Sequence, residues 1–191
     1  PPERDLAALA RRQVPPVPAV AGRGAVGLWS LYPRRELHRN MPMDLRVALG
    51  DIGLFSHFFT GFVLRDYQAA PARAIVEAVL DPDRSIDRTS ALVFSRQAGK
   101  DETLAQLIAY LLLRHSRAGG SIVVCAPTLR PQAMISADRL WDRVSTSPIT
   151  KRFSRRNGAT IHGGRARATY VSLAPGSNAR GQTASILLVG N

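Results

Sequence analysis

The sequence predicts an α/β fold in which a parallel sheet carries helices on both faces. Two observations favour this class. From residue 64 onward, short aliphatic runs alternate with segments of helical periodicity, and Gly, Pro or polar turns separate them. Each run is aliphatic throughout rather than alternating with polar residues. Such strands are buried on both faces, as in a parallel sheet covered by helices.

The chain divides into an N-terminal extension or linker, residues 1–63, and a core, residues 64–191. The extension has aromatic residues that should pack on something, but its topology cannot be derived from the pattern. In the core the patterns predict, in order, a helix with Pro71 in its first turn, a strand at 91–94, a helix through the apolar stripe 104–112, a strand at 122–126, a helix at about 131–144, two short strands near 160–162 and 169–173, and a last strand at 186–189.

Composition excludes several classes of protein. No apolar run approaches the roughly 20 residues that a membrane-spanning helix requires, so no membrane is expected as a partner. A single cysteine excludes a disulfide framework and a multi-cysteine zinc site, and an intracellular location is the default. The formal net charge is +12, and no Asp or Glu follows Asp142. This charge reflects either an arginine-rich composition on solvated faces or a surface that meets a polyanion such as nucleic acid.

One motif predicts nucleotide chemistry. The aliphatic run that begins at Ala91 leads into Ser95-Arg-Gln-Ala-Gly-Lys100, and a helical stripe follows. This is the strand, loop and helix order of a phosphate-binding loop, or Walker A motif. Only two of the 26 basic residues are lysines. One of them, Lys100, stands where a compact ammonium group would reach phosphate oxygens.

The motif departs from the common phosphate loop in two places. Phe94 occupies the position of the first glycine, and Asp101 stands where a Ser or Thr hydroxyl usually meets Mg²⁺. The last aliphatic run should end in a metal-binding Asp followed by a Glu that polarises water. Asn191 occupies the Asp position, so we expect the core to be truncated at this Walker B strand. Asp101 either shares a metal site with Asn191 or caps the helix that begins beside it.

Four ordered segments resemble the ATPase domain of the large terminase subunits of tailed phages. They are the phosphate loop of Ser-Arg-Gln type, the upstream motif Arg65-Asp-Tyr-Gln68, residues 123–133 with the second strand and its loop, and residues 173–181 with the strand 186–189. The resemblance covers residues 64–191 and implies a P-loop NTPase fold of the RecA-like kind. It implies an ATPase that drives double-stranded DNA into a capsid.

The resemblance also implies cofactors, partners and site residues. The cofactors are ATP and Mg²⁺, and the partners are double-stranded DNA, a portal, a small terminase subunit and further copies of the chain in a ring. The location is the cytoplasm of the infected cell, transiently on the procapsid. Lys100 and Arg96 would be catalytic, the latter as an arginine finger acting in its own subunit. The nucleotide would be held by Ser95, Gln97, Ala98, Gly99, Lys100, Asp101, Glu102, Tyr67 and Gln68, and the metal by Asp101 and Asn191. Apart from the resemblance, the basic segment after Asp142 predicts that Arg152, Arg155 and Arg156 bind DNA.

Two alternatives remain open at the level of the sequence. A helicase-like nucleic-acid translocase shares the glutamine motif and the sheet. A degenerate phosphate-loop module that binds DNA or assists assembly without hydrolysis would also account for Asp101 and Asn191. Because the water-polarising Glu is missing, we expect residues 1–191 alone to bind nucleotide without appreciable turnover.

Overall fold

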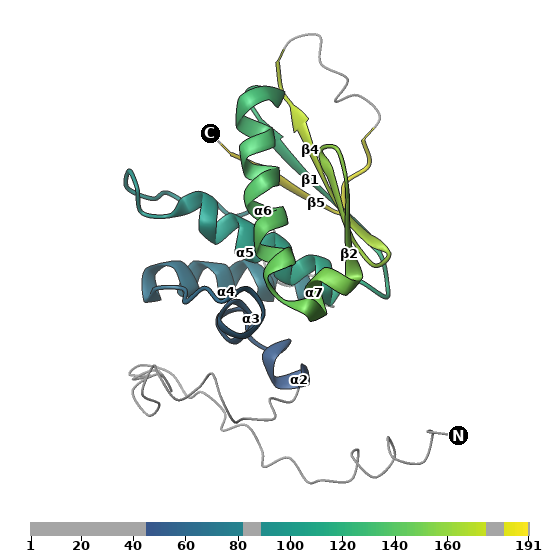
Figure 1. Ribbon diagram of the computed structural model, residues 1–191. Coiled ribbons are helices and arrows are strands. Elements are labelled where there is room, and N and C mark those ends of the chain that lie inside the picture. The colour runs from purple at the N-terminus through teal and green to yellow at the C-terminus, as the bar shows by residue number, and fades with distance from the viewer. Residues whose placement is uncertain (1–44, 82–88, 175–181, 191) are drawn as a thin grey trace, which may run out of the picture. The chain divides into compact units, whose positions relative to one another are not determined.

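The computed structural model describes residues 45–81, 89–174 and 182–190. Residues from Met43 onward form one compact unit. Its elements are α2 (Leu45–Ala48), α3 (Ile52–Thr60), α4 (Asp66–Leu80), α5 (Lys100–Arg114), β1 (Gly120–Ala126), the irregular turn η2 (Leu129–Ala133), α6 (Met134–Thr146), α7 (Pro148–Phe153), β2 (Ser154–Asn157), β3 (Thr160–Gly163), β4 (Ala166–Ser172) and β5 (Ile186–Val189) (Figure 1).

The five described strands form one mixed sheet in the order β2-β3-β4-β1-β5. β1 pairs in parallel with β4 on one side and with β5 on the other. The strands β2, β3 and β4 form an antiparallel meander. The α/β class is therefore confirmed, with a parallel centre as the aliphatic runs predicted and an antiparallel extension that they did not predict.

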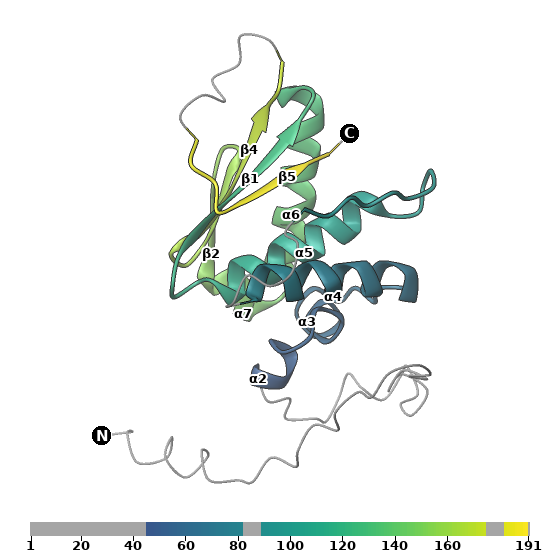
Figure 2. The ribbon, with the colours of Figure 1, turned by 180° about the vertical axis from the view of Figure 1, so that it is seen from behind.

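The helices that pack on the sheet, α5, α6 and α7, lie on one side of it (Figures 1 and 2). The strand residues of the main apolar core are in register on one face of the sheet, as in Ile122 of β1 and Ala168 of β4. Alternate residues point to opposite faces of a strand, so this core lies on the helical face. On the other face, Val123 and Cys125 of β1 are also buried, each 4% exposed. In the described part of the chain the second face carries no helix, although the sequence predicted helices on both.

Helix α5 is the centre of this core. The predicted stripe is buried, with Leu107, Ile108, Leu111 and Leu112 each at most 2% exposed. A Cβ atom on Gly163 of β3 would stand 3.0 Å from the Cβ atom of Leu112, so glycine permits the close approach of β3 to α5.

Helix α3 also belongs to this unit, on the opposite side of α5. The Phe55 ring meets the edge of Tyr110 at a centroid distance of 5.4 Å. The Tyr110 hydroxyl donates a hydrogen bond of 2.6 Å to the Leu49 carbonyl. The sequence placed α3 in the extension, but its aromatic residues pack against α5. The compact unit therefore begins well before residue 64.

Two predicted elements differ from the structure. Helix α4 begins at Asp66, so Pro71 lies in its second turn rather than its first. The run Ala91–Phe94 is not a strand, because it pairs with no described strand, and Val93 is 95% exposed.

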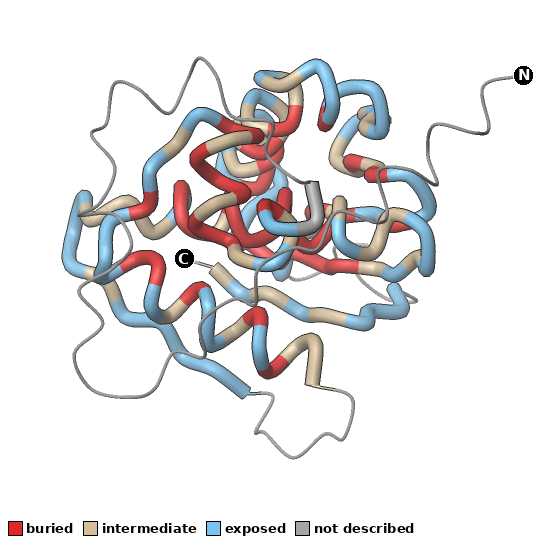
Figure 3. Tube along the Cα trace, turned by 90° about the horizontal axis from the view of Figure 1, so that it is seen from below, coloured by how far each residue is buried: buried red, intermediate tan, exposed pale blue. Residues whose placement is uncertain are grey.

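Strand β5, which leads to the C-terminal end, is an edge strand of the described sheet. It is drawn in tan and pale blue throughout, unlike the buried red segments (Figure 3). Its Leu187 and Val189 are exposed.

Candidate functional site

The loop before α5 has the backbone geometry of an anion-binding site. Gln97 and Gly99 have left-handed φ values of 61° and 80°, and Ala98 between them does not. The Ala98 amide closes a turn by donating to the Ser95 carbonyl at 3.2 Å. Left-handed residues beside residues of negative φ can turn N–H groups toward one point and form a nest for an anion. The Ala98 N–H is already bound within the turn, so an anion would meet the N–H groups on either side of it. The nest leads into the N-terminus of a 15-residue helix, whose first N–H groups and dipole also favour negative charge.

The side chain of Gln68, in the first turn of α4, binds the backbone of this loop. Its amide group donates to the carbonyls of Ala98 at 3.3 Å and Gly99 at 3.4 Å. Its amide oxygen accepts a bond of 3.0 Å from the Arg65 backbone N–H, at the start of α4. Gln68 is 2% exposed. We expected Gln68 to read an adenine edge, but in the structure both ends of its amide are bound to the protein and stabilise the loop.

Tyr67 touches the same loop from the solvent side. Its hydroxyl donates to the Ala98 carbonyl at 3.1 Å, and its ring meets the Phe94 ring edge-on at 6.3 Å. Arg65, Tyr67 and Pro71 border an open depression whose other wall is the loop from Ala91 to Ala98. Tyr67 is 46% exposed, so its ring is available to a flat group that enters the depression.

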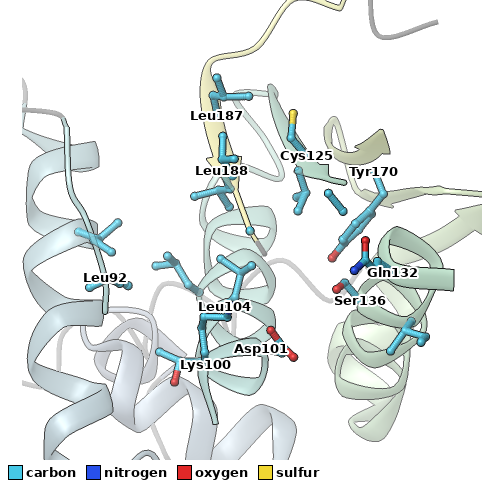
Figure 4. Close-up of a pocket in the computed structure, with 18 of the residues that line it drawn as sticks. Leu92, Lys100, Asp101, Leu104, Cys125, Gln132, Ser136, Tyr170, Leu187 and Leu188 are labelled. Carbon is cyan, nitrogen blue, oxygen red and sulfur yellow. The ribbon is translucent and has the colours of Figure 1, made fainter. Parts of the chain in front are cut away.

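Lys100 and Asp101 lie at the start of α5 and border a cavity of about 410 Å³. The other walls are the carboxyl ends of β1 and β5 together with Gln132 and Ser136 (Figure 4). The Asp101 carboxylate points from α5 toward the helix that carries Ser136 (Figure 4). It forms a loose ion pair with Arg139 of α6 at 3.7 Å. The helix cap is Gly99, so Asp101 does not cap α5.

The remaining predicted nucleotide contacts fall into two groups. Ser95, Arg96 and Gln97 are exposed on the outer side of the loop. Glu102 is buried, and its carboxylate is bound to Arg143 and to the Gln106 amide, so its side chain faces the core and not the loop. Only its backbone belongs to the start of the helix that a phosphate would meet.

Of the two predicted metal ligands, Asp101 and Asn191, the structure describes only Asp101. Asn191 lies outside the described residues. Gly190, directly before it, lines the same cavity as Lys100 and Asp101. The carboxyl end of β5 and the start of α5 therefore face a common space. No group of three His, Cys, Asp or Glu residues gathers to hold a metal within the parts of the chain that the structure describes.

The predicted DNA cluster is split by strand geometry. Arg155 and Arg156 are neighbours on β2, so their side chains point to opposite faces of the sheet. Arg156 pairs with Asp138 of α6 at 2.6 Å and also donates to the Gly158 carbonyl. Arg155 is exposed on the face without helices, and Arg152 is exposed on α7. The three arginines do not form one patch.

Sequence reasoning missed the polar contacts that tie α5 to its neighbours. Gln106 donates to Glu102 at 2.8 Å, and the Thr60 hydroxyl donates to Gln106 at 2.7 Å. Arg139 and Arg143 reach α5 from α6. One signal was present: Gln106 interrupts an apolar helix and lies one turn after Glu102, a spacing at which side chains meet.

The fold described above resembles that of a solved protein. A crystal structure of the large terminase of bacteriophage HK97 matches with a TM-score of 0.56 and 19% identity, over 74% of this chain and 30% of the phage protein. The described chain has the fold of a large terminase. No protein-family model matches the sequence, and no curated protein does.

The chain spans about a third of the length of the HK97 terminase. None of the helices in the described ranges is long and apolar enough to cross a membrane.

Proposed function

We propose that this chain binds ATP at the loop Ser95–Lys100 and forms the ATPase part of a DNA-packaging motor of the large-terminase kind. The observation that carries the proposal is the nest formed by Gln97, Ala98 and Gly99 at the N-terminus of α5, with Lys100 as the next residue. The terminase fold supports the assignment to a packaging motor rather than to a helicase-like translocase.

The residues of the loop fit a triphosphate. Backbone N–H groups would hold the β-phosphate in the nest, and Lys100 would place a cation beside the terminal phosphates. Arg96, exposed on the same loop, would stabilise the charge that spreads over the transferred phosphoryl group. The depression beside Tyr67 offers room for the base.

Asp101 and the carboxyl end of β5 fit a Mg²⁺ ion. Mg²⁺ takes oxygen ligands and is usually held by one or two carboxylates with waters and substrate phosphates. Asp101 presents one carboxylate to the cavity, and its loose pair with Arg139 leaves it accessible. When bound, the ion would supply charge neutralisation at the phosphates. Asn191 remains the proposed second ligand.

The wider role of the proposed motor follows from its terminase likeness. Double-stranded DNA is the polymer that ATP hydrolysis would move. A portal, a small terminase subunit and further copies of this chain in a ring are the proposed partners. The proposed place of action is the cytoplasm of an infected cell, at the procapsid.

The two lysines provide a matched test of nucleotide binding. Lys100→Ala removes the cation beside the nest, whereas Lys151→Ala removes the same charge from the exposed surface of α7. We expect ATP and ADP binding, measured by calorimetry with Mg²⁺, to be lost in Lys100→Ala and kept in Lys151→Ala. Circular dichroism should show both variants folded. Equal affinity in the two variants would contradict the nucleotide site.

A second candidate is a module that binds nucleotide without hydrolysing it. The departures from the common motif favour it, because Phe94 occupies the position of the first glycine and Asp101 that of the hydroxyl residue that usually meets Mg²⁺. Because residues 1–191 alone are not expected to turn over ATP, the binding of a transition-state analogue separates the two candidates. Binding of ADP with Mg²⁺ and aluminium fluoride that is tighter than binding of ADP with Mg²⁺, and loses this gain in Arg96→Ala, supports the motor. Equal binding of ADP with and without the fluoride supports the module.

A further inference from the structure

The sheet face that lies away from the helices carries a row of basic side chains. Arg155 of β2 is paired with His162 of β3, and His162 with Arg167 of β4. Each is the sequence neighbour of a residue that faces the helices, namely Arg156, Ile161 and Ala168. Because side chains alternate along a strand, the three project from the face without helices. Neighbouring strands lie about 4.8 Å apart, so the row extends over about 10 Å. The Arg167 guanidinium also reaches the Ser121 hydroxyl of β1 at 3.4 Å.

A second row on the same face carries hydroxyl and amide groups. Asn157 pairs with Thr160, and Thr160 with Thr169, whose hydroxyl groups lie 3.4 Å apart. On each strand the residue of this second row lies two positions from the residue of the basic row, so both rows are on the same face. Together the rows present guanidinium, imidazole, hydroxyl and amide groups. These are the side-chain groups that contact phosphate and sugar in protein–DNA complexes.

Among the described residues no acidic side chain balances this face. The chain has no Asp or Glu after Asp142, so none lies on β2, β3 or β4. The described ion pairs engage Arg73, Arg139, Arg143 and Arg156, and neither Arg155 nor Arg167 is among them. Like charges on facing strands oppose folding. A bound anion would offset the charge of this row.

The titration of His162 agrees with this arrangement. Burial, followed by the charges of Arg155 and Arg167, lowers the pKa of His162. The groups that face the imidazole from the two strands packed beside it are these two arginines. Near neutral pH a ligand therefore meets two fixed positive charges with a neutral hydrogen-bonding group between them.

The face contains no Phe, Tyr or Trp among the residues of its two rows. Proteins that hold single-stranded nucleic acid use aromatic side chains on which the bases stack. A face without them can contact the backbone but cannot stack exposed bases. The chemistry therefore favours an intact duplex over a single strand.

We propose that the face formed by β2, β3 and β4 binds the phosphate backbone of duplex DNA through Arg155 and Arg167. This inference rests on the proposed function, in which DNA is the polymer moved, and it assigns the surface that holds the polymer. Binding is independent of base sequence and strongly dependent on salt, because each phosphate contact releases counterions. Arg156 points to the helices and takes no part in it.

The experiment compares neighbouring arginines on one strand. Binding of a duplex of arbitrary sequence is measured at 50 and 200 mM salt for the wild-type chain, Arg155→Ala, Arg155→Ala with Arg167→Ala, and Arg156→Ala. The double variant should lose roughly two units of the salt slope, so its deficit against wild type shrinks about ten-fold between the two salt concentrations. Arg156→Ala should keep the wild-type slope, since its charge change is the same but its side chain faces the helices. Arg155→Lys should keep most of the slope because it keeps the charge.

Each outcome is decisive. If Arg156→Ala weakens binding as much as Arg155→Ala, net charge and not this face governs binding, and the inference is wrong. Tighter binding of a single strand than of a duplex also overturns it. If the wild-type chain binds no duplex, the DNA part of the proposed function fails together with the inference. If it binds but the double variant is unchanged, the proposed function stands and this face is excluded. ATP binding, measured on the same samples, should be the same in every variant.

Discussion

The guanidinium of Arg143 donates two hydrogen bonds to the carboxylate of Glu102, at 2.7 and 2.9 Å. The pair joins the first turn of α5 to the last turn of α6. Glu102 also accepts from Gln106, and Gln106 accepts from Thr60 of α3. The start of α5 is therefore fixed by two other helices through polar contacts that require correct geometry on both sides.

We expect Glu102→Ala to destabilise the fold by about 2 kcal/mol, because it leaves a partly buried guanidinium without its partner. The double variant Glu102→Leu with Arg143→Met should be nearly neutral, since an apolar pair can replace a buried ion pair. Chemical denaturation of Glu102→Leu, Arg143→Met and their double variant gives the coupling energy. Additive losses would show that the pair is not coupled. Nucleotide affinity should fall in Glu102→Ala, since the helix start would be less well fixed.

Gly99→Ala should abolish nucleotide binding. Its φ of +80° is unfavourable for alanine, and its Cβ atom would stand 2.6 Å from Nε2 of Gln68. Gly158 is a matched control, because its φ is +57° but a Cβ atom there meets no atom within 4 Å. Gly158→Ala should cost only the backbone strain, about 1–2 kcal/mol. Calorimetry with ADP and thermal unfolding separate the two effects. The expectation fails if both variants bind ADP like the wild-type chain.

The affinity for ADP should depend steeply on Mg²⁺ because of Asp101. A carboxylate about 4 Å from a phosphate charge is repelled by roughly 4 kcal/mol at an effective dielectric constant near 20, and a metal between them reverses the sign. Asp101→Asn should therefore improve ADP binding without metal and reduce the gain that Mg²⁺ brings. Titrations with and without Mg²⁺ measure both. An identical gain in the two proteins would leave Asp101 only as the partner of Arg139.

The fold should lose stability as the pH falls from 7.5 to 5.5. Burial and then Arg114 lower the pKa of His115, and burial with two arginines lowers that of His162. Because both pKa values are lower in the folded state, the unfolded chain binds more protons below about pH 6.5, and acidification favours unfolding. His162→Gln should reduce this pH dependence, as measured by denaturant midpoints at the two pH values. An unchanged pH dependence in that variant would contradict the contribution of His162.

The sequence predicted the parts of the fold that have a strong local pattern. Continuous aliphatic runs located β1 and β5, and apolar periodicity located α5 and α6. β2 was missed because Ser154–Asn157 holds no apolar residue, and only its pairing with β3 makes it a strand. The run Ala91–Phe94 shows the converse, because it has the composition of a strand but no described partner. Strand formation depends on neighbours that local composition does not reveal.

For the candidate site, too, the sequence indicated features with a local pattern but not the contacts between distant residues. Glycine and lysine in sequence marked the turn before α5, where Gln97 and Gly99 have left-handed φ values. Binding of phosphate at this loop stays a prediction. The contacts of Glu102 with Arg143 join residues 41 positions apart, so no local pattern reports them. The role of Gln68 in holding the loop also depends on the packing of α4. The sequence identified residues near the site, but the tertiary structure determines which partner each side chain binds.

The edge strand β5 has a consequence for handling the protein in solution. Among the described residues only β1 pairs with it, and Leu187 and Val189 are exposed on it. Unpaired backbone N–H and C=O groups beside apolar side chains form a template on which another chain can add a strand. Concentrated preparations of residues 1–191 are therefore prone to aggregate along this edge, and a lysine in place of Leu187 would be the first substitution to improve solubility.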